Sequence, residues 1–341
     1  MNGKPIVITL GDPAGIGPEI IVKAFRDEPD LLHGCFVAGD LGSLRRATRI
    51  VTGADGLAMP VGSIEAAEEA WDIPPRCIPL LQVVEPPASF DMGAVSAAAG
   101  RVAGECVVWA ARAALRGEVA AIVTAPLHKE SLAAAGFAFP GHTELLQAES
   151  AAHLGRAVAD VPVRMMLANH ELRTVLVSIH LSLRDAIAAV NVDGVRQTLR
   201  IAHEALSRAL GRAPRIAVAG LNPHAGEGGL FGSEERQVIE PAIAAARADG
   251  IDVRGPFAPD TVFMRARGFG EFDAVIAMYH DQGLIPVKYL GVEQGVNVTL
   301  GLPLVRTSPD HGTAFDIAGT GRAGAASLLE AIRVARSLAG G

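Results

Sequence analysis

The stretch IVITLGDPAGIGPEI, residues 6–20, decides the class of fold. Residues 6–10 are an unbroken apolar run, which predicts a buried parallel strand. The glycine- and proline-rich turn that follows leads into a helix, which we expect to continue to Phe25. A buried strand that passes directly into a helix is the repeating unit of α/β proteins, so the sequence predicts an α/β fold.

The glycines of this turn match a dinucleotide-binding fingerprint only in part. Gly15 and Gly17 supply a Gly-x-Gly pair, but Ile20 stands where the third glycine of that fingerprint belongs. We therefore interpret the segment as a strand-to-helix loop at the mouth of a crevice.

The rest of the chain continues the alternation of strands and helices, which predicts a mostly parallel sheet. Predicted strands cover residues 35–38, 119–124, 163–168, 174–179, 216–221 and 273–278, the third and fourth of them as a hairpin. Predicted helices cover residues 95–116, 145–154, 185–210, 233–249 and 327–338, with Ser233 as the cap of the fourth. Residues 51–92 are rich in proline and predict an irregular excursion with short strands.

Length and composition bound the domain organisation and exclude several classes of protein. The chain has 341 residues, half of them apolar, which is ample for two lobes. We expect residues 1–127 and 306–341 to form the first α/β lobe and residues 128–305 the second, with a cleft between them. The net charge of −7 argues against a nucleic-acid partner.

Cysteine usage and hydropathy predict the compartment. The three cysteines are scattered and form no Cys-x-x-Cys pair, so neither a disulfide framework nor a cysteine zinc site is indicated. The apolar run near the first residue is too short for a signal peptide, and no stretch approaches the ~18 apolar residues of a membrane span. We expect a cytoplasmic protein without a membrane partner.

Three of the ten histidines follow directly on predicted strands. His180 lies in Ser-Ile-His-Leu, His224 in Asn-Pro-His-Ala-Gly and His280 in Tyr-His-Asp-Gln-Gly. Residues at the carboxyl ends of parallel strands converge on one crevice in an open α/β sheet. Three imidazoles that converge there can hold a divalent metal ion and leave coordination positions open, as in a catalytic site.

A plainer interpretation applies to each of these histidines, because histidine is often only a half-buried polar residue. The glycines after His224 let the backbone approach a ligand closely, which favours the interpretation of these histidines as metal ligands. Asp260 and Asp281 are the carboxylates nearest to these segments in the sequence. Either one can orient a ligating imidazole by accepting its second ring N–H.

A second polar group suggests an anion site. Lys288, Asn297 and Arg306 each lie beside apolar residues, where a cation is costly unless it meets an anion. Two cations with an amide donor suit a phosphate group, and a solvated strand edge is the alternative. His142 and Thr143 stand at the start of a predicted helix, where anions are favoured. A simple helix cap explains Thr143 equally well.

Six blocks of the sequence together resemble the 4-hydroxythreonine-4-phosphate dehydrogenase family of pyridoxal phosphate biosynthesis. The resemblance runs along nearly the whole chain, and its blocks are residues 11–19, 141–144, 220–227, 279–283, 297–303 and 306–313. It implies two α/β/α lobes, as in isocitrate and isopropylmalate dehydrogenases, with the active site in the cleft. It also implies that NAD, or NADP, binds without the usual glycine fingerprint.

The resemblance also implies roles for particular residues. Metal-ligand positions are His180, His224 and His280, and substrate positions are His142, Thr143, Lys288, Asn297 and Arg306. Members are homodimers whose metal site draws on both subunits, with the first two of those histidines from one chain and His280 from the other.

The implied reaction is a metal-assisted oxidation with zinc, cobalt, magnesium or manganese. It converts 4-phosphooxy-L-threonine to a β-keto acid, which decarboxylates to 3-amino-2-oxopropyl phosphate. Relatives act on 4-phospho-D-threonate or erythronate. Others oxidise a dihydrodiol of an aromatic dicarboxylate, and these tend to lack the substrate residues that this chain retains.

Two alternatives belong to other classes, namely a metal-dependent phosphatase and a non-catalytic phosphometabolite-binding protein. The chain lacks the His-Glu-x-x-His motif and the nucleophile elbow of common hydrolases. No residue is identified as the proton acceptor.

Overall fold

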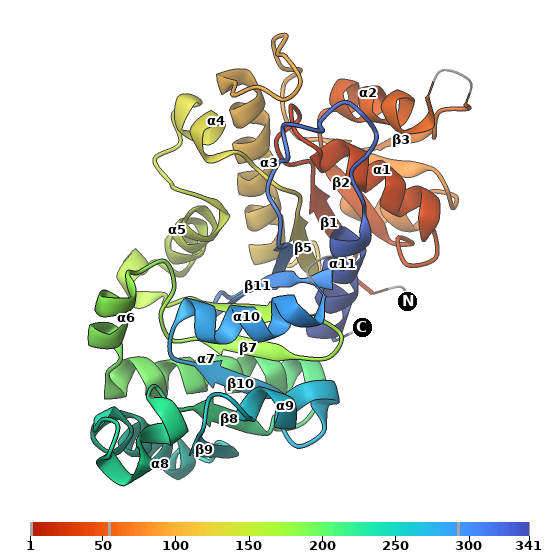
Figure 1. Ribbon diagram of the computed structural model, residues 1–341. Helices are drawn as coiled ribbons and strands as arrows, with labels where there is room; N and C mark the ends of the chain where they lie inside the picture. Colours follow the sequence, from red (N-terminus) through yellow and green to blue (C-terminus); the bar gives the residue numbers. More distant parts are fainter. Residues whose placement is uncertain (1–2, 54–55, 292–293, 341) are drawn as a thin grey trace. The chain divides into compact units, whose positions relative to one another are not determined.

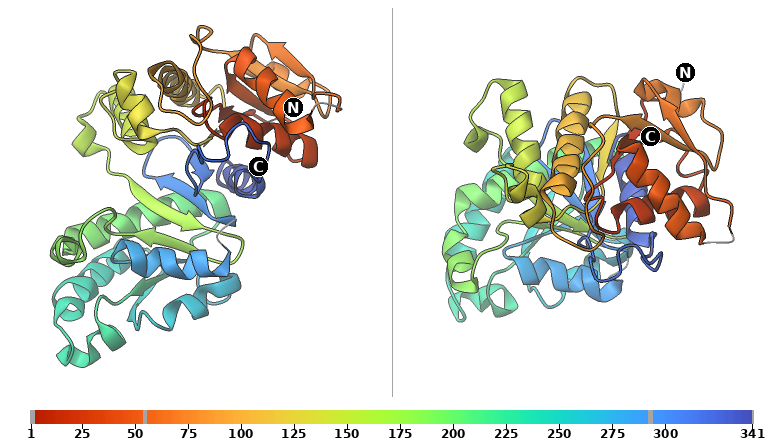
Figure 2. Two further views of the ribbon diagram at one scale, coloured as in Figure 1. Left: turned by 45° about the horizontal axis from the view of Figure 1, so that its top comes forward. Right: turned by 90° about the horizontal axis from the view of Figure 1, so that it is seen from above.

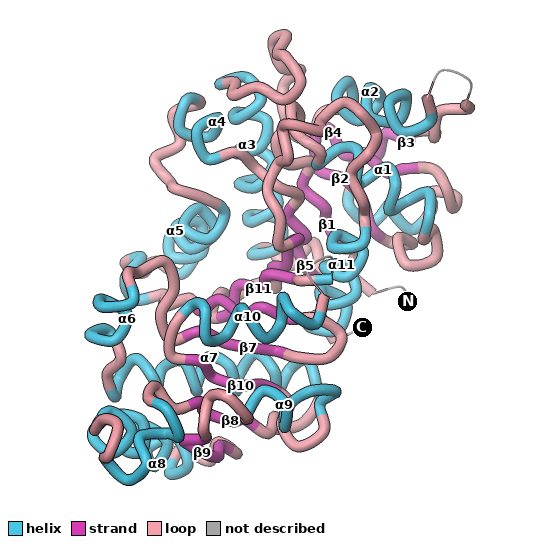
Figure 3. Tube along the Cα trace, in the orientation of Figure 1, coloured by secondary structure: helices cyan, strands magenta, loops and turns pink. Residues whose placement is uncertain are grey.

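The computed structural model describes residues 3–53, 56–291 and 294–340 (Figure 1). The chain divides into two compact units. Unit 1 comprises Met1–Pro162 with Leu302–Ala339, and unit 2 comprises Val163–Gly301. Both units combine strands with helices in the alternation that the sequence predicts (Figure 3), so the α/β class is confirmed. Residues 1, 2 and 341, the predicted ends of the first lobe, lie outside the described part.

Within the described residues, unit 1 contains six strands, and all neighbouring pairs for which a register is defined are parallel. Their order in the sheet is β3 (Val61–Ile64), β4 (Ile78–Gln82), β2 (Cys35–Gly39), β1 (Ile6–Thr9), β5 (Ala121–Thr124) and β12 (Arg306–Pro309). The central strands are apolar and completely buried, because helices cover both faces of a parallel sheet.

The helices of unit 1 come from both parts of the chain. They are α1 (Gly17–Asp27), α2 (Leu41–Thr52), α3 (Ala97–Leu115), α4 (Lys129–Ala134), α5 (His142–Leu154) and α11 (Ala326–Leu338). Helix α3 packs on β1, β2 and β5, and α11 packs on β5 and β12 (Figure 2). Helices α4 and α5 pack on α3, which explains why residues 128–162 group with unit 1 rather than with the second lobe that was expected.

Unit 2 has a mixed sheet. Its described strands follow the order β11 (Val296–Leu300), β6 (Arg164–Ala168), β7 (Arg173–Leu176), β10 (Ala274–Ala277), β8 (Ile216–Ala219) and β9 (Val253–Phe257). Strands β11, β6 and β7 pair in antiparallel fashion, and the other pairs are parallel. The predicted hairpin is therefore confirmed as β6 and β7, and the sheet pairing over both units is mostly parallel.

The helices of unit 2 surround this sheet. They are α6 (Leu183–Ala189), α7 (Val192–Leu210), α8 (Glu240–Ala248), α9 (Val262–Ala266) and α10 (His280–Leu290). Figures 1 and 2 show α10 on one face of the strands and α7 on the other. None of the helices in the described segments is long and apolar enough to cross a lipid bilayer.

Two predicted helices differ from the observed ones. The predicted helix over residues 185–210 is two helices. The first ends at Ala189, and Asn191 caps the start of α7, where its Oδ1 accepts a hydrogen bond from Gly194 N at 2.8 Å. The predicted start of the helix over residues 233–249 is confirmed: helical backbone begins at Glu234, and the carbonyl oxygen of Ser233 accepts a hydrogen bond from Gln237 N at 2.9 Å. The first turn of this helix differs from the expected α-helix. A π-helical turn over Glu235–Ile239 precedes α8 and turns Glu235 into the protein interior.

Candidate functional site

The three histidines follow three strands that are neighbours in the sheet of unit 2. The strand order is β7, β10, β8, and both pairs are parallel, so their carboxyl ends lie at one edge. His180 follows β7, His280 begins α10 directly after β10, and His224 follows β8. The structure therefore brings the three histidine loops to the same edge of the sheet.

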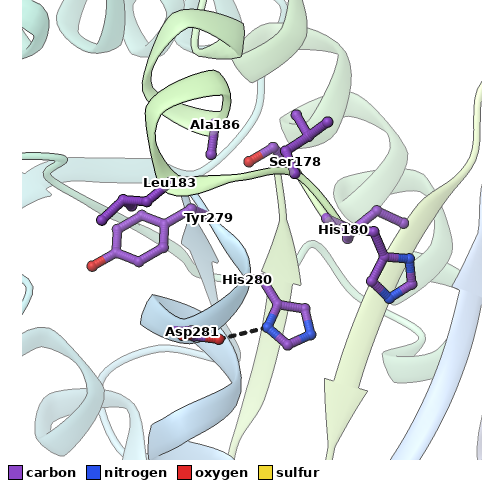
Figure 4. A pocket seen from close by; sticks show the side chains of 9 residues that line it. Ser178, His180, Leu183, Ala186, Tyr279, His280 and Asp281 are labelled. Atoms are coloured by element: carbon purple, nitrogen blue, oxygen red, sulfur yellow. Dashed lines mark hydrogen bonds and ion pairs between the residues drawn. The ribbon is translucent and has the colours of Figure 1, made fainter.

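His180 and His280 lie beside each other at this edge (Figure 4). The centroids of their rings are 5.8 Å apart, and the ring planes are tilted by 41°. Two imidazoles that share one zinc ion have centroids about 5 Å apart, because each Zn–N bond is about 2.0–2.1 Å long. The observed pair therefore fits two ligands of one divalent ion.

A carboxylate orients one ring of this pair. Nδ1 of His280 lies 2.7 Å from Oδ1 of Asp281 (Figure 4), which leaves Nε2 of His280 available to a metal ion. A pocket of about 280 Å³ opens beside the rings and is lined by residues 178–181, Leu183, Ala186 and residues 279–281. Asp260, the other carboxylate considered, is exposed in the turn before α9.

The backbone around His224 winds in the left-handed sense. His224, Ala225 and Glu227 have φ values of +54°, +52° and +42°, and Gly226 and Gly228 continue the same turn. A non-glycine residue in this region costs roughly 1–2 kcal/mol. Strain of this kind persists only where surrounding contacts enforce it, and it clusters at functional sites.

The described residues of one chain do not bring a complete set of metal ligands together. Over residues 3–53, 56–291 and 294–340, no three His, Cys, Asp or Glu side chains are grouped closely enough to hold a metal ion. His224 is thus not grouped with the pair formed by His180 and His280. This pairing differs from the division that the resemblance implied, in which His180 and His224 come from one chain.

Unit 1 contains a buried cation at the start of β12. Arg306 is 4% exposed, and its Nη2 and Nε donate to Oγ1 of Thr124, at 2.8 and 3.2 Å, at the end of β5. Burial lowers the pKa of Arg306 to about 10, and the charge of Glu144 opposes that shift. A guanidinium held in the interior is well suited to bind an anionic ligand group.

His142 lies near this cation. Burial and the charge of Arg306 lower the pKa of His142 well below its usual range, against a hydrogen bond with the backbone of Ala125, so its imidazole is neutral at neutral pH. Its Nε2 is buried without a hydrogen-bond partner, which a ligand atom can satisfy. Helix α5 begins at His142 with Gly141 as its cap, so Thr143 is not the helix cap.

The other two predicted substrate residues belong to unit 2. Lys288 lies in the last turn of α10. The alternative interpretation, in which Lys288 is part of a solvated strand edge instead of an anion site, is therefore wrong. Asn297 is half-buried on β11, where it is paired with Leu167 of β6.

The glycines of the first loop pack against the protein itself. A Cβ atom on Gly15 would lie 2.9 Å from Cβ of Thr313, and one on Gly17 would lie 2.7 Å from the carbonyl oxygen of Leu10. These glycines serve close packing within unit 1, so they do not fit a dinucleotide phosphate cradle.

Sequence reasoning missed several residues that shape these sites. Thr124 is only the last residue of the predicted strand over residues 119–124, and Glu235 lies within the predicted helix over residues 233–249 with no role of its own. Gln282 lies inside the block that includes His280 but was given no role. Only the tertiary structure shows that Glu235 and Gln282 are buried, with exposures of 1% and 9%.

Polar and ionisable groups at the carboxyl ends of buried strands define the class as an α/β enzyme. The chain belongs to the family described as "Pyridoxal phosphate biosynthetic protein PdxA", which matches residues 32–335. The resemblance found in the sequence is thereby confirmed.

Three relatives illustrate the similarity. The chain is 52% identical to a 4-hydroxythreonine-4-phosphate dehydrogenase of Beijerinckia indica, over 99% of this chain and 96% of the relative. It is 46% identical to a D-threonate 4-phosphate dehydrogenase of Salmonella typhimurium, over 99% of this chain and 100% of the relative. A crystal structure of a 4-hydroxythreonine-4-phosphate dehydrogenase from Klebsiella pneumoniae has a TM-score of 0.87 and 42% identity, covering 99% of this chain and 100% of that one.

Proposed function

We propose that the chain is a dehydrogenase that oxidises 4-phosphooxy-L-threonine, also called 4-hydroxythreonine 4-phosphate. The product is a β-keto acid, which loses CO₂ and leaves 3-amino-2-oxopropyl phosphate, a precursor in pyridoxal phosphate biosynthesis. Membership in the family and the names of relatives that match 99% of the chain support the proposal. The structural observation that carries it is the pairing of His180 with His280 beside a pocket.

The substrate phosphate is assigned to the buried cation. Arg306 supplies a permanent charge and two or more N–H donors, which suit phosphate oxygens. His142 can donate a hydrogen bond from its buried, neutral ring. Three further side chains remain predicted substrate residues, namely Thr143, Lys288 and Asn297. Their hydroxyl, ammonium and amide groups, respectively, can bind a phosphorylated hydroxy acid.

A divalent metal ion is assigned to the histidines. The distance between the rings of His180 and His280, and the carboxylate that holds Nδ1 of His280, fit this group. When bound, such an ion would lower the pKa of the substrate hydroxyl and stabilise the enolate left by decarboxylation. Zinc, cobalt, manganese and magnesium are the candidate ions, with imidazole ligands favouring the first two.

NAD, or NADP, is proposed as the hydride acceptor, because the relatives are named dehydrogenases. The glycines of the first loop do not fit its diphosphate, so no residue of that loop is assigned to it.

The protein is further proposed to be a cytoplasmic homodimer with a metal site shared between subunits. The buried and half-buried cysteines are free thiols, which suits a reducing compartment. His224 is exposed on its turn, where it can reach the histidine pair of a second copy.

The second candidate substrate is 4-phospho-D-threonate, because the Salmonella relative is 46% identical. The two substrates differ at C2, which carries an amino group in one and a hydroxyl group in the other. Formation of reduced nicotinamide should be measured with both compounds and with their unphosphorylated analogues. A higher kcat/KM for 4-phosphooxy-L-threonine supports the first proposal, a higher value for the threonate supports the second, and no turnover of either contradicts both.

A further inference from the structure

The loops that lead to His224 and His280 are joined by one buried side chain. Oε1 of Gln282 accepts a hydrogen bond from Met278 N at 2.7 Å, in the segment just before His280. Nε2 of the same side chain donates to the carbonyl oxygen of Gly220 at 2.7 Å, in the segment before His224. Gln282 therefore sets the separation of the two loops.

The same line of hydrogen bonds reaches the third histidine loop. Oγ of Ser178 donates to the carbonyl oxygen of Met278 at 2.9 Å, so the peptide groups of Met278 are held from both sides. All three bonds are buried, where water cannot replace them. A break in one of them leaves an unsatisfied polar group inside the protein.

A buried carboxylate holds the left-handed turn of His224. Oε1 of Glu235 accepts hydrogen bonds from Leu221 N and Asn222 N, at 2.8 and 2.7 Å, and Oε2 accepts from Nδ2 of Asn222 at 2.9 Å. A Cβ atom on Gly226 would lie 2.7 Å from Oε2, so the turn is packed directly on the carboxylate. Glu235 thus contacts both the entrance and the interior of the turn.

The hydrogen bonds to Glu235 and Gln282 do more than close a loop, because they hold a turn whose backbone is strained. Three non-glycine residues stand at positive φ, and a relaxed loop of the same length would avoid that cost. The hydrogen bonds to Glu235 and Gln282 compensate for the strain only while the turn keeps its observed conformation. His224 is the residue whose direction that conformation determines.

We propose that Gln282 and Glu235 are positioning residues that fix the two loops from which His224 and His280 each reach a metal ion, with His224 directed to the histidine pair of a second copy. This inference rests on the proposed function, in which these histidines bind a divalent ion. Neither positioning residue contacts the ion in this assignment, because each one acts through a histidine loop.

The test uses the full-length, metal-free protein and two substitutions of one residue. Gln282→Glu keeps an acceptor for Met278 N but cannot donate to Gly220, whereas Gln282→Met removes both hydrogen bonds. Gln237→Met is the matched control, because Gln237 is exposed on the neighbouring π-helical turn. Hydrogen–deuterium exchange should be compared over residues 220–231 and 278–284.

Gln282→Met should speed exchange in both segments, and Gln282→Glu mainly in residues 220–231. Loss of a buried hydrogen bond predicts exchange that is roughly three- to tenfold faster. Cobalt(II) titration should then show about 10–100-fold weaker binding and an altered visible spectrum in both variants. Glu235→Gln, which retains the size of the side chain, should give the same pattern over residues 220–231. The control should match the wild-type protein in both measurements.

Unchanged exchange over residues 220–231 in both Gln282 variants overturns the proposal. Faster exchange with wild-type cobalt affinity also overturns it, because the residues would then be structural only. A wild-type protein that binds no cobalt contradicts the proposed function instead, and altered exchange in the variants would still support the link between the loops.

Discussion

The two ends of strand β10 carry polar residues for different purposes. At the amino end, Asp273 is 2% exposed and accepts paired hydrogen bonds from Arg212 and Arg215, at 2.8–3.1 Å. At the carboxyl end, His280 and its neighbour Asp281 are partly exposed beside a pocket. One end satisfies its charges internally, and the other leaves a ring nitrogen available.

This difference shows how a single strand separates stability from chemistry. The hydrogen-bonded Asp273 joins β10 to the segment between α7 and β8, so it fixes the strand in the sheet. Beside the carboxyl end of β10, the neighbouring strands β7 and β8 lead into loops with strained backbone, at His180 (φ +25°) and His224 (φ +54°) respectively. Substitutions at the two ends should therefore affect different measurements.

The largest expected effect is at the carboxyl end. His280→Ala should reduce kcat/KM by about a thousandfold or more, because a metal contributes several kcal/mol to the transition state. The free energy of unfolding should change by less than about 1 kcal/mol, since the side chain is partly exposed. Exhaustive chelation of the wild-type enzyme should have the same effect on activity, with recovery on adding zinc or cobalt. Full turnover of rigorously metal-free enzyme would contradict the metal assignment.

Mixed dimers can decide which histidines belong to one subunit. If one chain contributes His180 and His280, as their ring distance suggests, His180→Ala mixed with His224→Ala should regain up to about a quarter of wild-type activity. His180→Ala mixed with His280→Ala should then stay inactive. Each site takes both of these histidines from one subunit, so each site of a mixed dimer carries one of the two substitutions.

The division implied by the family resemblance gives the opposite pattern, in which His180→Ala recovers with His280→Ala and not with His224→Ala. Subunit exchange must be verified independently, for example by mass-tagged subunits. No recovery in either mixture despite exchange would remove the shared-site model.

At the amino end, Asp273→Asn should destabilise the protein by about 2–3 kcal/mol, because it weakens several charge-assisted hydrogen bonds at once. Urea unfolding gives the free energy, and kcat/KM of the folded variant should stay within about twofold of wild type. Arg254, whose partner Glu271 is 37% exposed, offers a surface control, and Arg254→Ala should cost less than about 1 kcal/mol. If Asp273→Asn and Arg254→Ala lowered the free energy of unfolding by similar amounts, the buried hydrogen bonds of Asp273 would contribute no more to stability than a surface ion pair.

A smaller effect is expected for the buried cation of unit 1. Arg306→Ala should lower kcat/KM for the phosphorylated substrate by about 10–100-fold, the value of one charge-assisted contact. The unphosphorylated analogue should lose much less. An equal loss with both compounds would show that Arg306 supports the fold and not the phosphate.

The smallest effect concerns pH. Burial disfavours ionisation of Asp273, but hydrogen bonds from Arg212 and Arg215 outweigh it and lower the pKa of Asp273 below its usual value of 3.8. Because the pKa of this carboxyl group is lower in the folded state than in the unfolded state, its ionised form stabilises the fold at pH values above the unfolded-state pKa. That stabilisation is lost as the pH falls toward the folded-state pKa.

The wild-type protein should therefore lose stability below about pH 4 more steeply than Asp273→Asn, by at most about 1.4 kcal/mol per pH unit. Urea unfolding at a series of acidic pH values measures the difference. Parallel curves for the two proteins would show that this carboxyl group does not titrate with folding.

Local sequence patterns predicted most of the strands that lead to these sites. Residues 6–10, 119–124, 216–221 and 273–278 are short apolar runs followed by turn residues, and each corresponds to a buried strand. Strand β12 and helix α10 were missed. Arg306 and Pro309 interrupt the apolar pattern of β12, and Gly283 and Pro286 weaken the helical pattern of α10.

What the sequence determined by itself is the α/β class, the family and the three histidines at strand ends, because apolar runs, turn residues and sequence blocks are local properties. Only the tertiary structure decided that His180 faces His280, that Glu235 turns inward and that Arg306 is buried near His142. The physical reason is that the first and third relations join residues 100 and 164 positions apart in the sequence. The hydrogen-bond partners of Glu235 lie only 13 and 14 residues away, but the turn of its side chain into the interior changes the solvent around it. Strand order and the path of the backbone set them, and neither is encoded in the spacing of residues along the chain.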